Sequence, residues 1–184
     1  MLFTVISILA MVGLDQLTKY WATLALAPDK VVPFLPGIME FRYILNDGAA
    51  FSMFSGRSWG QWFLVGVTTA ALLVVLYLLL LRRNKLQPLA YAGLLLIEAG
   101  GIGNLIDRIA NGYVVDFFAT TFVDFAVFNV ADCFVTIGVA LLVVYYLRSE
   151  IAQKKQKETA AAKPAAGLEL EENAGEAQGE HHVQ

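Results

Sequence analysis

Four long apolar segments alternate with shorter polar ones along the chain, and this pattern predicts a membrane protein. A helix needs about 20 consecutive, mostly apolar residues to cross a bilayer. Residues Val65 to Leu81 carry no charge, and three other segments are of comparable length and hydrophobicity. We therefore predict four transmembrane helices, at residues 2–26, 59–81, 88–109 and 129–148.

The composition supports this class, since 58% of the residues are hydrophobic, 16% are charged and the mean hydropathy is +0.61. The first segment also has features of a cleavable signal peptide, because Ala25-Leu26-Ala27 resembles a small-residue cleavage site. However, no Lys or Arg precedes the apolar run, and Asp15 and Lys19 interrupt it before that site. We expect an uncleaved helix.

The segments between the helices predict a small amount of β-structure. Pro and Gly residues in 28–58 flank a β-prone stretch from Ile38 to Leu45, which favours a small strand platform. Residues 1–150 are expected to form the transmembrane domain. Residues 151–184 are rich in Ala, Glu, Lys, Gln and Gly and are expected to be largely disordered. The predicted fold class is an all-α membrane protein with four transmembrane helices, a small extracytoplasmic β-strand platform and a disordered C-terminal tail.

Basic residues predict how the chain is oriented in the membrane. They follow the second and the last apolar segments, as Arg82, Arg83, Lys85, Arg148, Lys154, Lys155 and Lys157. Because cytoplasmic flanks of transmembrane helices are enriched in Lys and Arg, both termini should be cytoplasmic. The segments 28–58 and 110–128 should then be extracytoplasmic.

Polar residues gather near the predicted outer ends of the helices. Asp15 and Lys19 are four residues apart, so they can pair on one helix face. With the predicted orientation, five clusters reach one depth: Asp15/Thr18/Lys19, Asn46–Phe51, Asn104/Asp107/Arg108, Asp116 and Asn129/Asp132. Any one of these residues could be an interfacial charge or a helix cap. Five clusters at one depth favour a functional site, whereas Glu98 lies deeper and receives no catalytic role.

Elimination narrows the chemistry of such a site. Gly56 to Gly60 match the G-x-S-x-G pattern, but both histidines stand at 181 and 182, so the serine has no base in the folded part. Cys133 also lacks a partner and is expected to be a packing residue. The chain has no H-E-x-x-H motif and no Cys/His cluster, which excludes a zinc peptidase.

Carboxylates remain as the candidate catalytic groups. Two aspartates held close together share one proton, so that one acts as a base and the other donates a hydrogen bond. The candidates are Asp107, Asp116, Asp124 and Asp132. Asp116 and Asp132 flank the outer connection between the third and fourth predicted helices, which suits a pair. Spacing alone does not dismiss Asp124.

Five motifs occur in order along the first 150 residues: DQLTK at 15–19, NDGAAF at 46–51, GNLIDR at 103–108, GYVVDF at 112–117 and FNVAD at 128–132. With these motifs the chain resembles the lipoprotein signal peptidase (signal peptidase II) family of bacterial intramembrane aspartyl endopeptidases. The resemblance implies that Asp116 and Asp132 are catalytic. It also implies two groups of supporting residues, a substrate-binding group (Asn46, Asn104, Arg108, Asn129) and a structural group (Asp15, Lys19, Asp107).

The resemblance also implies a substrate and a location. The substrates would be prolipoproteins whose lipobox cysteine carries diacylglyceryl, and the cut would fall just before that cysteine. No metal, other cofactor or nucleic acid is expected, and the protein should be a monomer surrounded by membrane lipid. It should reside in the bacterial plasma (inner) membrane, with its active site near the outer face.

Two other classes compete with a peptidase. A small non-enzymatic transporter with a carboxylate proton relay would also place ionisable residues in membrane helices. However, the polar clusters gather at one depth and trace no path across the membrane. A purely structural membrane protein would leave the Asp116 and Asp132 cluster unexplained.

Overall fold

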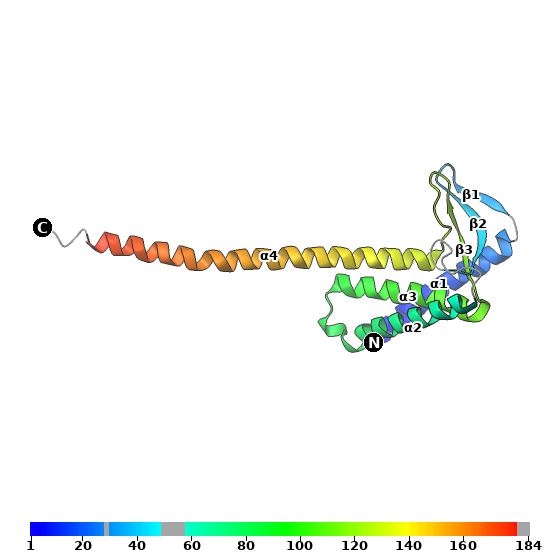
Figure 1. Ribbon diagram of the computed structural model, residues 1–184, viewed down its shortest axis with the longest axis horizontal. Coiled ribbons are helices and arrows are strands. Elements are labelled where there is room, and N and C mark those ends of the chain that lie inside the picture. Colours follow the sequence, from blue (N-terminus) through cyan, green and yellow to red (C-terminus); the bar gives the residue numbers. More distant parts are fainter. Residues whose placement is uncertain (28–29, 49–57, 180–184) are drawn as a thin grey trace. The chain divides into compact units, whose positions relative to one another are not determined.

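The structure is a computed structural model that describes residues 1–27, 30–48 and 58–179 (Figure 1). Its elements are α1 (Leu2–Leu26), β1 (Val31–Leu35), β2 (Met39–Asn46), α2 (Ser58–Leu81), the 3-10 helix η2 (Arg83–Lys85), α3 (Pro88–Asn111), β3 (Val114–Thr120) and α4 (Val130–Gly179). In these ranges four helices are long and apolar enough to span a membrane. This confirms the four predicted helices, whose starts lie within a residue or two of those expected.

The predicted strand platform is confirmed and is larger than expected. The three strands form one antiparallel sheet in the order β1-β2-β3. The third strand lies in 110–128, where the sequence predicts only a connection. Its first four residues, Val114 to Phe117, are all buried although Asp116 is among them, so the strand lacks the alternation of apolar and polar residues that marks a half-exposed strand.

The register of β2 on β3 brings the start of the NDGAAF motif beside the GYVVDF motif. Asn46 pairs with Val114 at one end of the ladder, and Ile44 pairs with Asp116. The C-terminal end of α1 packs against this sheet through a core of Ala22, Leu26, Val115 and Phe117. Because α1 is a membrane-spanning helix, this core fixes the sheet to the end of the helical bundle.

Glycines let α3 and α4 approach closely. A Cβ on Gly93 would stand 2.8 Å from the carbonyl oxygen of Gly138, and one on Gly138 would stand 2.7 Å from that of Gly93. A Cβ on Gly100 would overlap the carbonyl oxygen of Ala131 in the same way. Small residues therefore allow backbone-to-backbone packing, which is a main source of helix association in membranes.

The chain divides into two compact units, Met1–Leu142 and Val143–Gln184. The first unit contains α1 to α3, the sheet and the start of α4. In the second unit the α4 backbone is helical to Gly179, although the composition of 151–184 favours disorder. Ala, Glu, Lys and Gln are strong helix formers, so the same composition also favours helix in this segment. The predicted disorder of the tail stays a prediction.

The glycine contacts generate a stability prediction. We expect Gly93→Ala to lower the free energy of unfolding by about 1–3 kcal/mol, because the new methyl group meets the Gly138 carbonyl in a packed interface. Gly66→Ala is the matched control, since a Cβ on this α2 glycine meets nothing within 4 Å. Thermal unfolding in detergent measures both variants. Equal stabilities would contradict the close packing of α3 on α4.

Candidate active site

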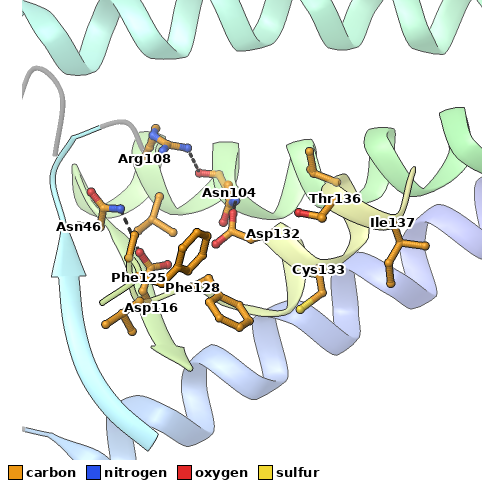
Figure 2. Close-up of a pocket in the computed structure, with 14 residues that line it drawn as sticks. Asn46, Asn104, Arg108, Asp116, Phe125, Phe128, Asp132, Cys133, Thr136 and Ile137 are labelled. Carbon is orange, nitrogen blue, oxygen red and sulfur yellow. Dashed lines mark hydrogen bonds between the residues drawn. The ribbon is translucent and has the colours of Figure 1, made fainter. Parts of the chain in front are cut away.

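A cavity of about 510 Å³ opens between the sheet and the helices α3 and α4 (Figure 2). Its polar lining consists of Asn46 from β2, Asn104 and Arg108 from α3, Asp116 from β3 and Asp132 from α4. The remaining lining is largely apolar and comes from Val114 on β3, from the segment 125–128 and from the first turns of α4. The cavity therefore has a charged side and an apolar side.

Asp132 is fixed by the start of α4. Its backbone N–H donates to Asn129 Oδ1 at 2.9 Å, and the Asn129 N–H donates to Asp132 Oδ2 at 3.1 Å. This reciprocal pair is a capping box, which satisfies backbone donors at a helix N-terminus. The other oxygen of Asp132 accepts from Asn104 Nδ2 at 2.8 Å. These donors and the positive end of the helix stabilise a negative charge on Asp132.

Asp116 stands in a different environment, on β3 and only 2% exposed. Its Oδ2 accepts from Asn46 Nδ2 at 3.0 Å and its Oδ1 accepts from Asn129 Nδ2 at 2.7 Å. Burial raises the pKa of Asp116 to about 6, against the lowering effect of the Asn46 hydrogen bond. The negative charge of Asp132 raises the pKa further, whereas Asn129 and Lys19 lower it.

Asn129 joins the two aspartates. Its side chain is fully buried, and it donates to Asp116 while its Oδ1 accepts from the Asp132 N–H. The Asn129 amide also donates to Asn104 Oδ1 at 3.0 Å. Asn129 is absent from the cavity lining, and its polar atoms are engaged inside the protein. A substrate-binding role for Asn129 stays a prediction, and its contacts suit positioning of the aspartates.

Lys19 supports Asp116 and Asp132 indirectly, through residues that lie beside them. Its Nζ contacts Asp15 Oδ2 at 2.9 Å and Asp107 Oδ2 at 3.1 Å, and it donates to Asn104 Oδ1 at 2.9 Å. These three acceptors match the three N–H donors of an ammonium group. Structural support is the role predicted for Asp15, Lys19 and Asp107. It stays a prediction, and these contacts suit it.

The acidic partners of Lys19 hold the backbone beside each aspartate of the cavity. Asp15 Oδ1 accepts from the Ala131 N–H at 2.9 Å, next to Asp132. Asp107 Oδ2 accepts from the Val115 N–H at 3.2 Å, next to Asp116. Gly103 makes this arrangement possible, because a Cβ there would stand 2.5 Å from Asp15 Oδ2.

Arg108 is held loosely by comparison. Its guanidinium donates to the carbonyl oxygens of Asn104 and Gly48 at 3.5 and 3.4 Å, and its buried Nε has no hydrogen-bond partner in the part of the chain that is described. The side chain faces the cavity and attracts both Asp116 and Asp132. It can therefore turn toward a further acceptor.

Two other acidic residues considered from the sequence, Asp124 and Glu98, do not line the cavity. Asp124 is exposed. Glu98 is buried elsewhere in α3, and one of its oxygens has no hydrogen-bond partner among the described residues. The last three residues of the NDGAAF motif lie outside the described residues, as do Gly56 and Arg57 of the G-x-S-x-G match.

Sequence reasoning missed three contributors to the site. Gln16 donates to Asp107 Oδ1 at 3.0 Å and to the Gly103 carbonyl oxygen at 3.1 Å, and its place in DQLTK was the available signal. Cys133 and Thr136 line the cavity on the apolar side. Cys133 was expected to be a packing residue, and nothing in the spacing alone indicated that it faces the cavity.

The buried cation generates a prediction. Lys19→Ala leaves Asp15 and Asp107 without their positive partner, and breaking a buried ion pair in this way costs about 3–5 kcal/mol. We expect a large loss of thermal stability in detergent. Lys30→Ala removes an exposed lysine and is the control. Similar unfolding temperatures for the two variants would contradict the supporting role of Lys19.

The pKa of Asp116 generates a second prediction. Because the folded-state pKa, about 6, lies above the ordinary value of 3.8, the protein loses stability as the pH rises from 4 through 6. The loss is on the order of 3 kcal/mol. Asp116→Asn should flatten this part of the pH profile of the unfolding temperature. Asp124→Asn, at an exposed site, should leave the profile unchanged. A wild-type profile without this fall would be inconsistent with a protonated Asp116.

Comparison with known proteins gives the family. The model of a family described as signal peptidase (SPase) II matches residues 7–148. Lipoprotein signal peptidases of Streptococcus pyogenes serotypes M6 and M5 are each 43% identical over 146 residues, which cover 79% of this chain and 93% of each relative. A solved bacterial membrane enzyme, determined by the in meso method at 2.3 Å resolution, is 28% identical with a TM-score of 0.72, over 80% of this chain and 89% of that one. The match to the family model and to relatives of nearly full length confirms the resemblance seen in the motifs, and the chain belongs to the signal peptidase II family.

Proposed function

We propose that this protein is an aspartic endopeptidase that removes signal peptides from prolipoproteins, with Asp116 and Asp132 as its catalytic residues. Membership of the family makes it a protease and a multi-pass bacterial membrane protein. The observation that carries the aspartic mechanism is the cavity itself. Two aspartates line it, both are hydrogen-bonded to Asn129, and their environments differ.

The unlike environments suggest how the two aspartates divide the chemistry. Asp132, held by donors and a helix N-terminus, is the general base that takes a proton from water. Asp116, whose pKa is raised to about 6, carries the shared proton and donates a hydrogen bond to the scissile carbonyl oxygen. The water oxygen then bonds to the carbonyl carbon. When the C–N bond breaks, the leaving amine takes up a proton from the pair.

The two sides of the cavity suit different parts of a lipid-modified precursor. Asn46, Asn104 and Arg108 offer donors to peptide carbonyls that have left water. The apolar side, which includes Phe125 and Phe128, suits side chains of a signal peptide or acyl chains. In the proposed reaction the cut falls before the diacylglyceryl-modified cysteine. The protein would act as a monomer with both termini in the cytoplasm and the cavity near the outer face.

A transporter with a carboxylate relay receives no support from these observations. The family is one of peptidases, and the relatives carry the name lipoprotein signal peptidase. The aspartates also meet in one cavity with a shared asparagine, an arrangement suited to a pair that acts on a single bond.

The proposed function is tested by cleavage of a diacylglyceryl-modified precursor with purified protein. We expect Asp116→Asn and Asp132→Asn each to lower kcat by about 10²–10⁴-fold, because each removes one partner of the proton transfer. The double variant should be little worse than either single variant, because the two groups act as one unit. Asp124→Asn is the matched control at an exposed aspartate and should retain normal turnover.

Each variant is checked for expression and membrane insertion. Near-normal turnover in either Asp116→Asn or Asp132→Asn would show that the catalytic pair is wrong. Failure of the wild-type protein to cut the modified precursor would overturn the proposed substrate.

A further inference from the structure

Gln61, in the first turn of α2, contacts two segments that enter the candidate site from different parts of the chain. Its side-chain Nε2 donates to the carbonyl oxygen of Asp47 at 2.7 Å and also to the carbonyl oxygen of Gly112. A carboxamide has two N–H donors, so one side chain satisfies both acceptors. The Gln61 Oε1 is buried without a hydrogen-bond partner among the described residues. If the amide were rotated by half a turn, its oxygen would face two carbonyl oxygens, and acceptors repel one another. The orientation in which the N–H groups face the carbonyls is therefore favoured.

The two carbonyls stand just beyond the end of the β2–β3 ladder. The final pair of the ladder is Asn46 with Val114. Asp47 follows Asn46 directly, and Gly112 ends α3 in the left-handed conformation, with φ of 81°, two residues before β3. Gln61, on α2, therefore links the two chain segments just beyond the last pair of this ladder.

The end of the ladder is where Asn46 reaches Asp116. Asn46 Nδ2 donates to Asp116 Oδ2, while Asn46 Oδ1 accepts from the Gly48 N–H at 3.0 Å. The Gly48 carbonyl oxygen in turn accepts from Arg108. A shift of the chain at Asp47 would thus move the donor on Asp116 and the acceptor of Arg108 together.

We propose that Gln61 is a positioning residue that acts on Asp116 through Asn46. Among the described residues, none that lines the cavity comes from α2, so Gln61 does not meet the substrate itself. Asp132 has separate supports in its capping box and in Asn104, so the effect of Gln61 falls on the Asp116 half of the site. This inference rests on the proposed peptidase function, and it adds α2 to the elements that set the catalytic geometry.

The kinetic test uses full-length protein and the lipid-modified precursor. Gln61→Ala and the isosteric Gln61→Glu, which cannot donate to the two carbonyls, should each lower kcat on the order of 10- to 100-fold with little change in KM. Gln87→Ala is the matched control, because Gln87 is exposed and its side chain makes no cap hydrogen bond at the start of α3. It should retain wild-type turnover.

A double-variant comparison tests whether Gln61 acts through Asn46. If Gln61 acts through Asn46, the variant that combines Gln61→Ala with Asn46→Ala should be no slower than Asn46→Ala alone. The proposal would be overturned if the kcat losses of the two single variants multiplied in the double variant. Normal kcat in both Gln61→Ala and Gln61→Glu would also overturn it.

A measurement without substrate separates this inference from the proposed function. The Asn46 hydrogen bond lowers the pKa of Asp116, so loosening it should raise that pKa. In Gln61→Ala, the fall in unfolding temperature with rising pH should therefore start at the same pH as in the wild type but continue to a higher pH. A merely structural role would lower the unfolding temperature equally at every pH, and this result would overturn the proposal even if the wild type cleaves its precursor normally.

Discussion

The site depends on one buried cation. A lysine in a membrane-spanning helix is costly unless it is paired, and Lys19 meets two carboxylates and an amide oxygen. Its acidic partners reach the backbone beside Asp132 on α4 and beside Asp116 on β3. The same ammonium also contacts Asn104, which donates to Asp132. The ion cluster therefore holds α1, α3, α4 and β3 in one arrangement, and the cavity is where these elements meet.

The two aspartates receive different support from this arrangement. Asp132 belongs to the start of a helix, where its carboxylate also caps backbone donors, so its position is set locally as well as by long-range contacts. Asp116 belongs to a strand and depends on side chains from β2 and from Asn129. A charge is well stabilised at Asp132, whereas burial favours the proton on Asp116. The asymmetry that the proposed acid–base chemistry requires thus follows from the elements that carry each residue.

The sequence predicted the helices well because membrane spans need long apolar runs, which few other structures produce. It predicted the strand region around Ile38 to Leu45, but not β3, because a strand buried on both faces lacks the alternating pattern. The ordered motifs identified most of the polar residues around the cavity. Spacing could not reveal that Cys133 faces the cavity or that Gln61 contacts the ladder end, since both depend on how distant segments pack.

Close packing of α3 on α4 makes the hydrogen bonds between these helices possible. The glycines of α3 bring α4 near enough for Asn104 to reach Asp132, and Gly103 leaves room for Asp15 to reach the Ala131 N–H. A side chain at these positions would therefore do more than reduce stability, because it would separate the aspartates from their donors. On the sheet side, the register of β2 on β3 performs the corresponding task by placing Asn46 opposite the start of β3. The catalytic geometry that we propose therefore depends first on how closely the backbones pack. The charged side chains then interact where these backbones lie close together.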